Sequence, residues 1–200
     1  MLNTEENAMA LITFFYTMCT FYGLTAQKVM DPLNKGKVNF WTANEVPEGT
    51  NGQCHTDDHL PHYAGVELSI GYLLNEKTTL TMGKGTIIHE VTHAWEHEVD
   101  PDFYGKVYNL LHKEEVKAKL YWDSGNLLEE PARLASLGYD VREVYSRLIN
   151  DRRVRQSVEA GTYDFVRIVS AELESFREKF YKPAYTNKVS LPLDLFRQIL

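Results

Sequence analysis

The chain has 200 residues, of which 44% are hydrophobic and 24% are charged. These proportions predict a folded globular protein and exclude a disordered chain. The formal net charge of −7 repels phosphate backbones and therefore argues against a nucleic-acid partner. Two cysteines, Cys19 and Cys54, are too few for a disulfide framework.

The first predicted element is a helix over about residues 4–28, which Gly23 is expected to end or bend. Its apolar stretch, residues 8–24, follows Glu5 and Glu6, whereas a secretory signal would carry positive charge there. The stretch is also shorter than the roughly 20 residues that a membrane span needs. We therefore expect a buried core helix, no membrane partner and a cytoplasmic location.

Strands are predicted next. Residues 37–42 combine aromatic and β-branched side chains and predict a strand, and the Pro- and Gly-containing segment 43–53 predicts a loop. Residues 65–72 alternate apolar and polar side chains, which predicts a strand with one wet face near a sheet edge. Residues 78–82 are a further short strand candidate.

A polar run between these strands holds six residues of metal-ligand type. Their spacing fits no zinc motif, so a polar loop is expected, with the alternative that one histidine reaches the active site or a second ion. The six residues are Cys54, His55, Asp57, Asp58, His59 and His62.

Helical patterns follow Gly85. The first helix is predicted over residues 86–98 and ends before Asp100-Pro101. Gly138 suits the position that directly follows the helix expected near residues 129–137. The order of strands and then helices predicts an α+β fold with two parts, residues 1–140 as one domain and 141–200 as a helical extension packed on it. The later helices are expected near 103–121, 129–137, 140–158 and 162–181.

The segment His89-Glu90-Val91-Thr92-His93 is an HExxH motif. Residues four apart lie on one face of a helix, so His89 and His93 can bind a common zinc ion. Glu90 projects beside that ion and can take a proton from water. On a helical wheel, the three residues share an arc of about 100° with Thr86 and His97, and the apolar residues face the other way.

The zinc ion needs a third protein ligand, and the spacing of the candidate residues from the HExxH motif limits which of them can serve. The metzincin pattern fails because Glu96 and Val99 stand where it requires glycine and histidine. His97 lies too far along the same helix and is expected to line the cleft. His112 sits in a charged helical stretch that is expected to face solvent.

The segment Glu129-Glu130-Pro131-Ala132 resembles the E-x-x-A sequence of the gluzincin zinc metallopeptidases. The resemblance implies a zincin-like domain in which Glu129 is the third ligand of one zinc ion per chain. Two features depart from it. Arg133 stands where many gluzincins have Asp or Asn, and Pro131 suits a first helical turn, which leaves Glu130 as the alternative ligand. Glu129 could also belong to a helix capping box.

The expected activity is that of a zinc metalloendopeptidase acting on proteins or peptides, with Glu90 as general base. His97 and Tyr139 are candidates for a cleft or oxyanion role. Strand 65–72 is the candidate for pairing with the substrate. The alternative function is a catalytically inactive zinc-binding protein with a regulatory or interaction role. The oligomeric state is not predicted.

Overall fold

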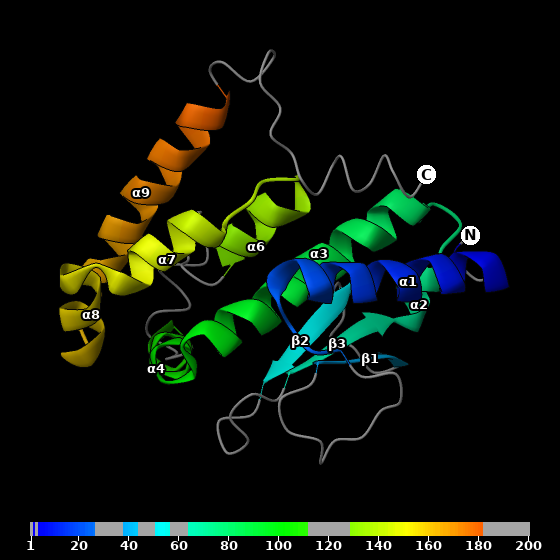
Figure 1. Ribbon diagram of the computed structural model, residues 1–200, viewed down its shortest axis with the longest axis horizontal. Coiled ribbons are helices and arrows are strands. Elements are labelled where there is room, and N and C mark those ends of the chain that lie inside the picture. Colours follow the sequence, from blue (N-terminus) through cyan, green and yellow to red (C-terminus); the bar gives the residue numbers. More distant parts are fainter. Residues whose placement is uncertain are drawn as a thin grey trace. The chain divides into compact units, whose positions relative to one another are not determined.

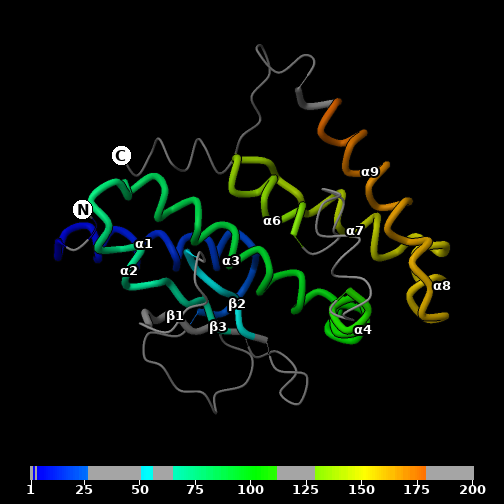
Figure 2. The backbone as a smooth tube through the Cα atoms, turned by 180° about the vertical axis from the view of Figure 1, so that it is seen from behind, coloured from blue at the N-terminus to red at the C-terminus, as the bar shows by residue number. Residues whose placement is uncertain are grey.

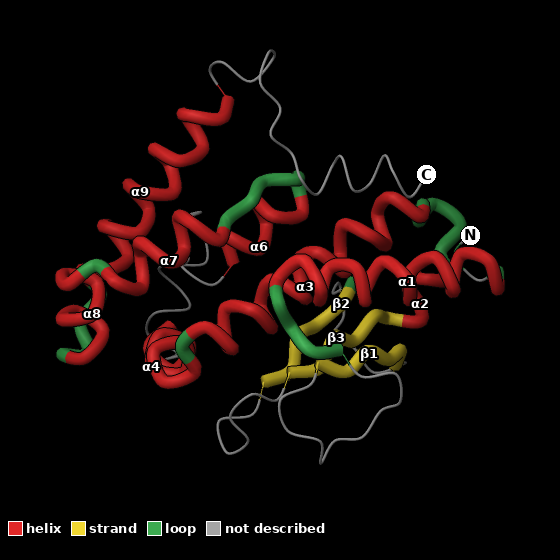
Figure 3. Tube along the Cα trace, viewed as in Figure 1, coloured by secondary structure: helices red, strands yellow, loops and turns green. Residues whose placement is uncertain are grey.

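The computed structural model describes residues 2, 4–26, 38–43, 51–56, 64–111 and 129–181. The chain forms two compact units, Met1–Pro101 and Asp102–Leu200 (Figure 1). The first unit combines helices with one small sheet, and the described part of the second contains helices only (Figure 3). This arrangement belongs to the α+β class, as predicted. The domain boundary expected at residue 140 stays a prediction.

In the first unit, α3 packs on a three-stranded sheet, and α1 packs against α3 (Figure 2). The strand order is β1-β3-β2, with β1 parallel and β2 antiparallel to β3. Val66 of β3 is the register partner of Phe40 on one side and of Cys54 on the other. The elements of this unit are α1 (Glu5–Tyr22), β1 (Val38–Ala43), β2 (Gly52–Thr56), β3 (Ala64–Ser69), α2 (Ile70–Leu74) and α3 (Leu80–Val99).

Helix α1 confirms the predicted core helix, although it ends six residues earlier than expected. Thr4 caps its first turn by accepting a hydrogen bond from the Asn7 backbone nitrogen. Gly23 ends it with φ of 71°, a left-handed conformation that glycine adopts without strain. Its buried face is almost entirely apolar, so hydrophobic burial holds it in the first unit. The buried residues are Leu11, Phe14, Phe15, Met18, Cys19 and Tyr22. Within the described ranges, no helix is both long and apolar enough to cross a membrane.

The sheet corrects three expectations. Strand β2 occupies a stretch that was expected to be loop, because backbone pairing with β3 forms a strand from a sequence without apolar alternation. Residues 65–72 do not lie at an edge, because β3 is the central strand and is paired on both sides. Its expected wet face is also wrong, since Glu67 is only 7% exposed. The strand ends at Ser69, whose hydroxyl accepts from the Tyr72 backbone nitrogen and caps α2.

The strand expected over residues 78–82 is the beginning of α3 instead. The Thr79 hydroxyl accepts a hydrogen bond from the Met82 backbone nitrogen, which is the geometry of a helix N-cap. This cap outweighs the β-branched composition of the segment. Helix α3 then continues to Val99, and Asp100 ends it as predicted.

The second unit is a set of helices in which α7, α8 and α9 contact one another. The single helix predicted over residues 140–158 is wrong, because Asp151 ends α7 and caps α8 by accepting from the Arg153 and Val154 backbone nitrogens. Gly138 has φ of 95°, which confirms its predicted place after α6. The described helices are α4 (Pro101–Leu111), α6 (Glu129–Ser136), α7 (Arg142–Asn150), α8 (Arg152–Glu159) and α9 (Asp164–Tyr181). The part of helix 103–121 beyond Leu111 lies outside the described residues.

Candidate functional site

Helix α3 provides the framework of the site. It packs on β2 and β3 with one side and on α1 with another. Gly83 allows the approach of α1, because a Cβ atom there would lie 2.9 Å from Leu2 and 3.1 Å from Leu11. Ile87, Ile88 and Val91 are completely buried and anchor the helix. The motif residues are therefore held on a packed helix and not on a surface loop.

The two motif histidines face one another within the first unit. Their Nε2 atoms are 3.2 Å apart and their rings are nearly perpendicular, at 86°. Two nitrogen ligands of a tetrahedral zinc ion at 2.0–2.1 Å lie roughly 3.3 Å from each other. The spacing of His89 and His93 therefore fits joint coordination of one zinc ion.

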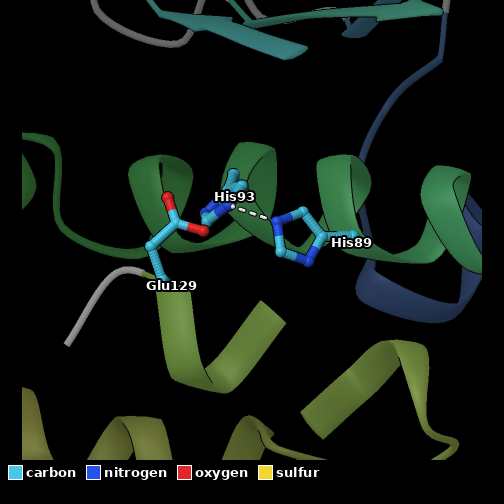
Figure 4. A group of neighbouring side chains, drawn as sticks. All are labelled: His89, His93 and Glu129. Atoms are coloured by element: carbon cyan, nitrogen blue, oxygen red, sulfur yellow. Dashed lines mark hydrogen bonds between the residues drawn. The ribbon is translucent and has the colours of Figure 1, made fainter. Parts of the chain in front are cut away.

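Glu129 is the first residue of α6 and has an exposed side chain. One ligand atom from each of His89, His93 and Glu129 lies within 4.8 Å of the other two (Figure 4). Two imidazoles and one carboxylate are a donor set that suits catalytic zinc and leaves a position open. The three residues predicted to be ligands are thus brought together.

Glu130, the alternative ligand, has a different environment. Its carboxylate is buried and accepts two hydrogen bonds of 2.7 Å from Arg133. A third hydrogen bond comes from Arg177 of α9. Two guanidinium groups therefore occupy the oxygens that a metal ion would need, which identifies Glu130 as a residue that fastens α6 to α9.

Glu90 follows His89 on α3 and is only 6% exposed. Cys54 of β2 lies close enough for the Glu90 and Glu96 carboxylates to act on its thiol. Burial, and then the negative charges of Glu90 and Glu96, raise the pKa of the Cys54 thiol well above its usual value. The face of β2 that carries Cys54 is therefore the face that meets the site helix.

The two residues that were expected to line a cleft or stabilise an oxyanion belong to different units. His97 is only 2% exposed, so it belongs to the buried part of α3. Tyr139 packs edge-on against Phe176 in the second unit, with ring centroids 6.3 Å apart. Their proposed roles stay predictions.

Only the beginning of the polar run 54–62 falls within the described residues. His55 of β2 lies 2.6 Å, Nε2 to Oε2, from Glu67 of β3. This pair is on strand positions that alternate with Cys54 and Val66, and hence on the opposite face of the sheet. His55 therefore does not point toward α3. The remaining residues of the run lie outside the described part.

One residue that contacts a motif histidine was not predicted from the sequence. Glu96 lies one turn beyond His93, and its Oε2 is 3.0 Å from His93 Nδ1. Glu96 was considered only as a departure from the metzincin pattern. Its spacing of three residues from His93, which places two side chains of a helix side by side, was the signal that could have found it.

In comparisons with known proteins, no family model, curated protein or solved structure matches the chain.

Proposed function

We propose that the protein is a zinc-dependent metalloendopeptidase of gluzincin type. The observation that carries the proposal is the grouping of ligand atoms from His89, His93 and Glu129 within 4.8 Å of one another. Glu90, buried and adjacent to His89 in the chain, adds the acid–base group that hydrolysis requires. A zinc site with a purely structural role would have no need of this carboxylate.

Each group has a distinct task in this proposal. His89, His93 and Glu129 would hold zinc, which supplies a Lewis acid that polarises a carbonyl and makes water acidic near neutral pH. Glu90 accepts a proton from the water whose oxygen bonds to the peptide carbonyl carbon. Glu90 then donates this proton to the nitrogen of the leaving amine as the carbon–nitrogen bond breaks. Burial suits Glu90 to this transfer, because low exposure keeps competing solvent away.

The substrate is proposed to be an extended peptide that pairs with β2. Strand addition requires an edge strand, and β2 is at one edge of the sheet formed by the described strands, whereas β3 is central. β2 also contacts the site helix α3. β2 therefore replaces residues 65–72 as the candidate substrate strand.

The test combines metal content with cleavage. We expect the wild-type protein to bind about one zinc ion per chain and to cleave a fluorogenic peptide library, with activity lost on chelation and restored by zinc. Glu129→Ala should lose zinc, and the matched variant Glu130→Ala should keep it. A wild-type protein without zinc, or zinc retention by Glu129→Ala, would refute the proposed site. A zinc-loaded protein that cleaves no member of the library would favour the inactive zinc-binding alternative.

A further inference from the structure

The hydrogen bond between His93 and Glu96 fixes which nitrogen of His93 carries a proton. A carboxylate only accepts hydrogen bonds, so the 3.0 Å contact requires a hydrogen on His93 Nδ1. In a neutral imidazole the lone pair is then on Nε2. That Nε2 atom is the one that faces His89 Nε2 at 3.2 Å.

The burial of the Glu96 carboxylate beside His93 is energetically unfavourable unless this pair has a function. The Glu96 side chain is completely buried and that of His93 is 8% exposed. Moving a carboxylate out of water is unfavourable unless its partners in the protein compensate for the lost hydration. An apolar side chain of similar volume at position 96 would avoid this cost. The carboxylate of Glu96 therefore contributes something other than packing.

We propose that Glu96 is a positioning residue that prepares His93 for the metal, a proposal that rests on the metal site proposed above. By accepting the Nδ1 hydrogen, Glu96 holds the ring orientation and keeps the Nε2 lone pair free for coordination. Its negative charge also makes the imidazole a stronger electron donor. Because Glu96 and His93 are on one helix, the pair is formed before any ion arrives.

The first measurement is zinc affinity, determined by competition with a chromophoric chelator. Loss of a residue that orients a metal-bound histidine typically weakens affinity about 10- to 100-fold, and we expect this loss for Glu96→Ala. Glu96→Gln keeps an acceptor oxygen without the charge and should fall between Glu96→Ala and the wild type. Glu98→Gln is the matched control, since Glu98 is exposed on the same helix, and should bind zinc as the wild type does.

The second measurement needs no metal. In the zinc-free protein at pH 8, imidazole nitrogen-15 shifts should show the Nδ1–H form for His93. Glu96→Ala should shift His93 toward the Nε2–H form, and Glu98→Gln should leave it unchanged. Glu96→Gln is close in shape to the native residue, so it remains informative if Glu96→Ala fails to fold.

The outcomes separate the two proposals. Wild-type zinc affinity in both Glu96 variants, or an Nε2–H tautomer of His93 in the wild-type protein, overturns the role of Glu96 and leaves the metal site standing. A wild-type protein that binds no zinc overturns both. Zinc binding that depends on Glu96, without any peptide cleavage, supports the positioning role and refutes only the peptidase.

Discussion

Two buried carboxylates, Glu96 in the first unit and Glu130 in the second, are nearly alike in exposure but differ in partners. Glu130 accepts hydrogen bonds from Arg133 and Arg177, whose guanidinium groups keep their charge at every accessible pH. Glu96 contacts an imidazole, which can be neutral and bind a metal ion. A carboxylate fixed by permanent cations fastens helices together, whereas one beside an imidazole can serve chemistry. The comparison predicts loss of stability in one unit and loss of function in the other.

The largest effect should come from Glu90, the other buried carboxylate of α3. Glu90→Gln removes the proton acceptor and should lower peptide cleavage about 10²- to 10⁴-fold. Zinc content and thermal stability should stay at wild-type levels, because the ligands and the apolar anchors of α3 are untouched. Steady-state kinetics and metal analysis of the same preparation test this. Full activity would remove Glu90 from the mechanism, and loss of zinc would make its role structural.

In the second unit, Glu130→Ala should reduce stability and leave zinc bound. The variant loses charge-assisted hydrogen bonds and leaves Arg133 and Arg177 to be solvated. Both arginines are partly exposed, so the expected cost is about 2 kcal/mol. Urea denaturation measures it, with Glu129→Ala as the control that should lose zinc without a comparable loss of stability in the zinc-free protein. Equal stability of Glu130→Ala and wild type would abolish the contrast between the two carboxylates.

The packing of β2 against α3 offers a sharper test within the first unit. A Cβ atom on Gly52 would lie 2.8 Å from Thr86 Cγ2 and 2.9 Å from the Glu67 backbone oxygen. Gly52→Ala should therefore cost about 1–3 kcal/mol and weaken zinc binding as β2 shifts against α3. Gly85→Ala is the control, because a Cβ atom there meets nothing within 4 Å, and it should stabilise α3 by about 0.5–1 kcal/mol. Destabilisation by both would show that general crowding, and not the β2 contact, is responsible.

The smallest effect concerns Asp151, a partly exposed counterpart of the buried carboxylates. Asp151→Ala should cost about 1 kcal/mol through loss of the α8 N-cap, whereas Asp151→Asn keeps a capping oxygen. The hydrogen bond from Arg153 is the main cause that lowers the pKa of Asp151 to about 2, against a smaller opposing effect of desolvation. Because the folded pKa lies below the unfolded one, this contribution is present above about pH 4 and is lost as the pH falls toward 2.

Denaturation curves between pH 2 and 6 test the Asp151 prediction. The wild type should lose its advantage over Asp151→Asn as the pH falls through this window. A constant difference between the two proteins would mean that the charge of Asp151 does not contribute to stability.

The elements that sequence reasoning found are those with local signals. The His89–His93 pair and the end of α6 at Gly138 were each identified from residues that lie within one or two helical turns of one another. Strand β2 was missed because its own composition is polar and it forms by pairing with β3, whose register partners lie 8 (Thr56 to Ala64) to 16 (Gly52 to Leu68) residues further along the chain. Position 79 shows the opposite failure, because a threonine that suits a strand caps a helix here. The α+β class followed from the order of elements, and the gluzincin resemblance remains a prediction.

The chain's two thiols, Cys19 and Cys54, both belong to the first unit. Burial raises the pKa of Cys19 to about 12, and Cys54 is shifted in the same direction. Alkylating reagents attack the thiolate, so native protein should react with iodoacetamide only slowly at neutral pH. Labelling would accelerate when the first unit opens. Cysteine chemistry thus provides a natural reporter confined to the half of the chain that carries the HExxH helix.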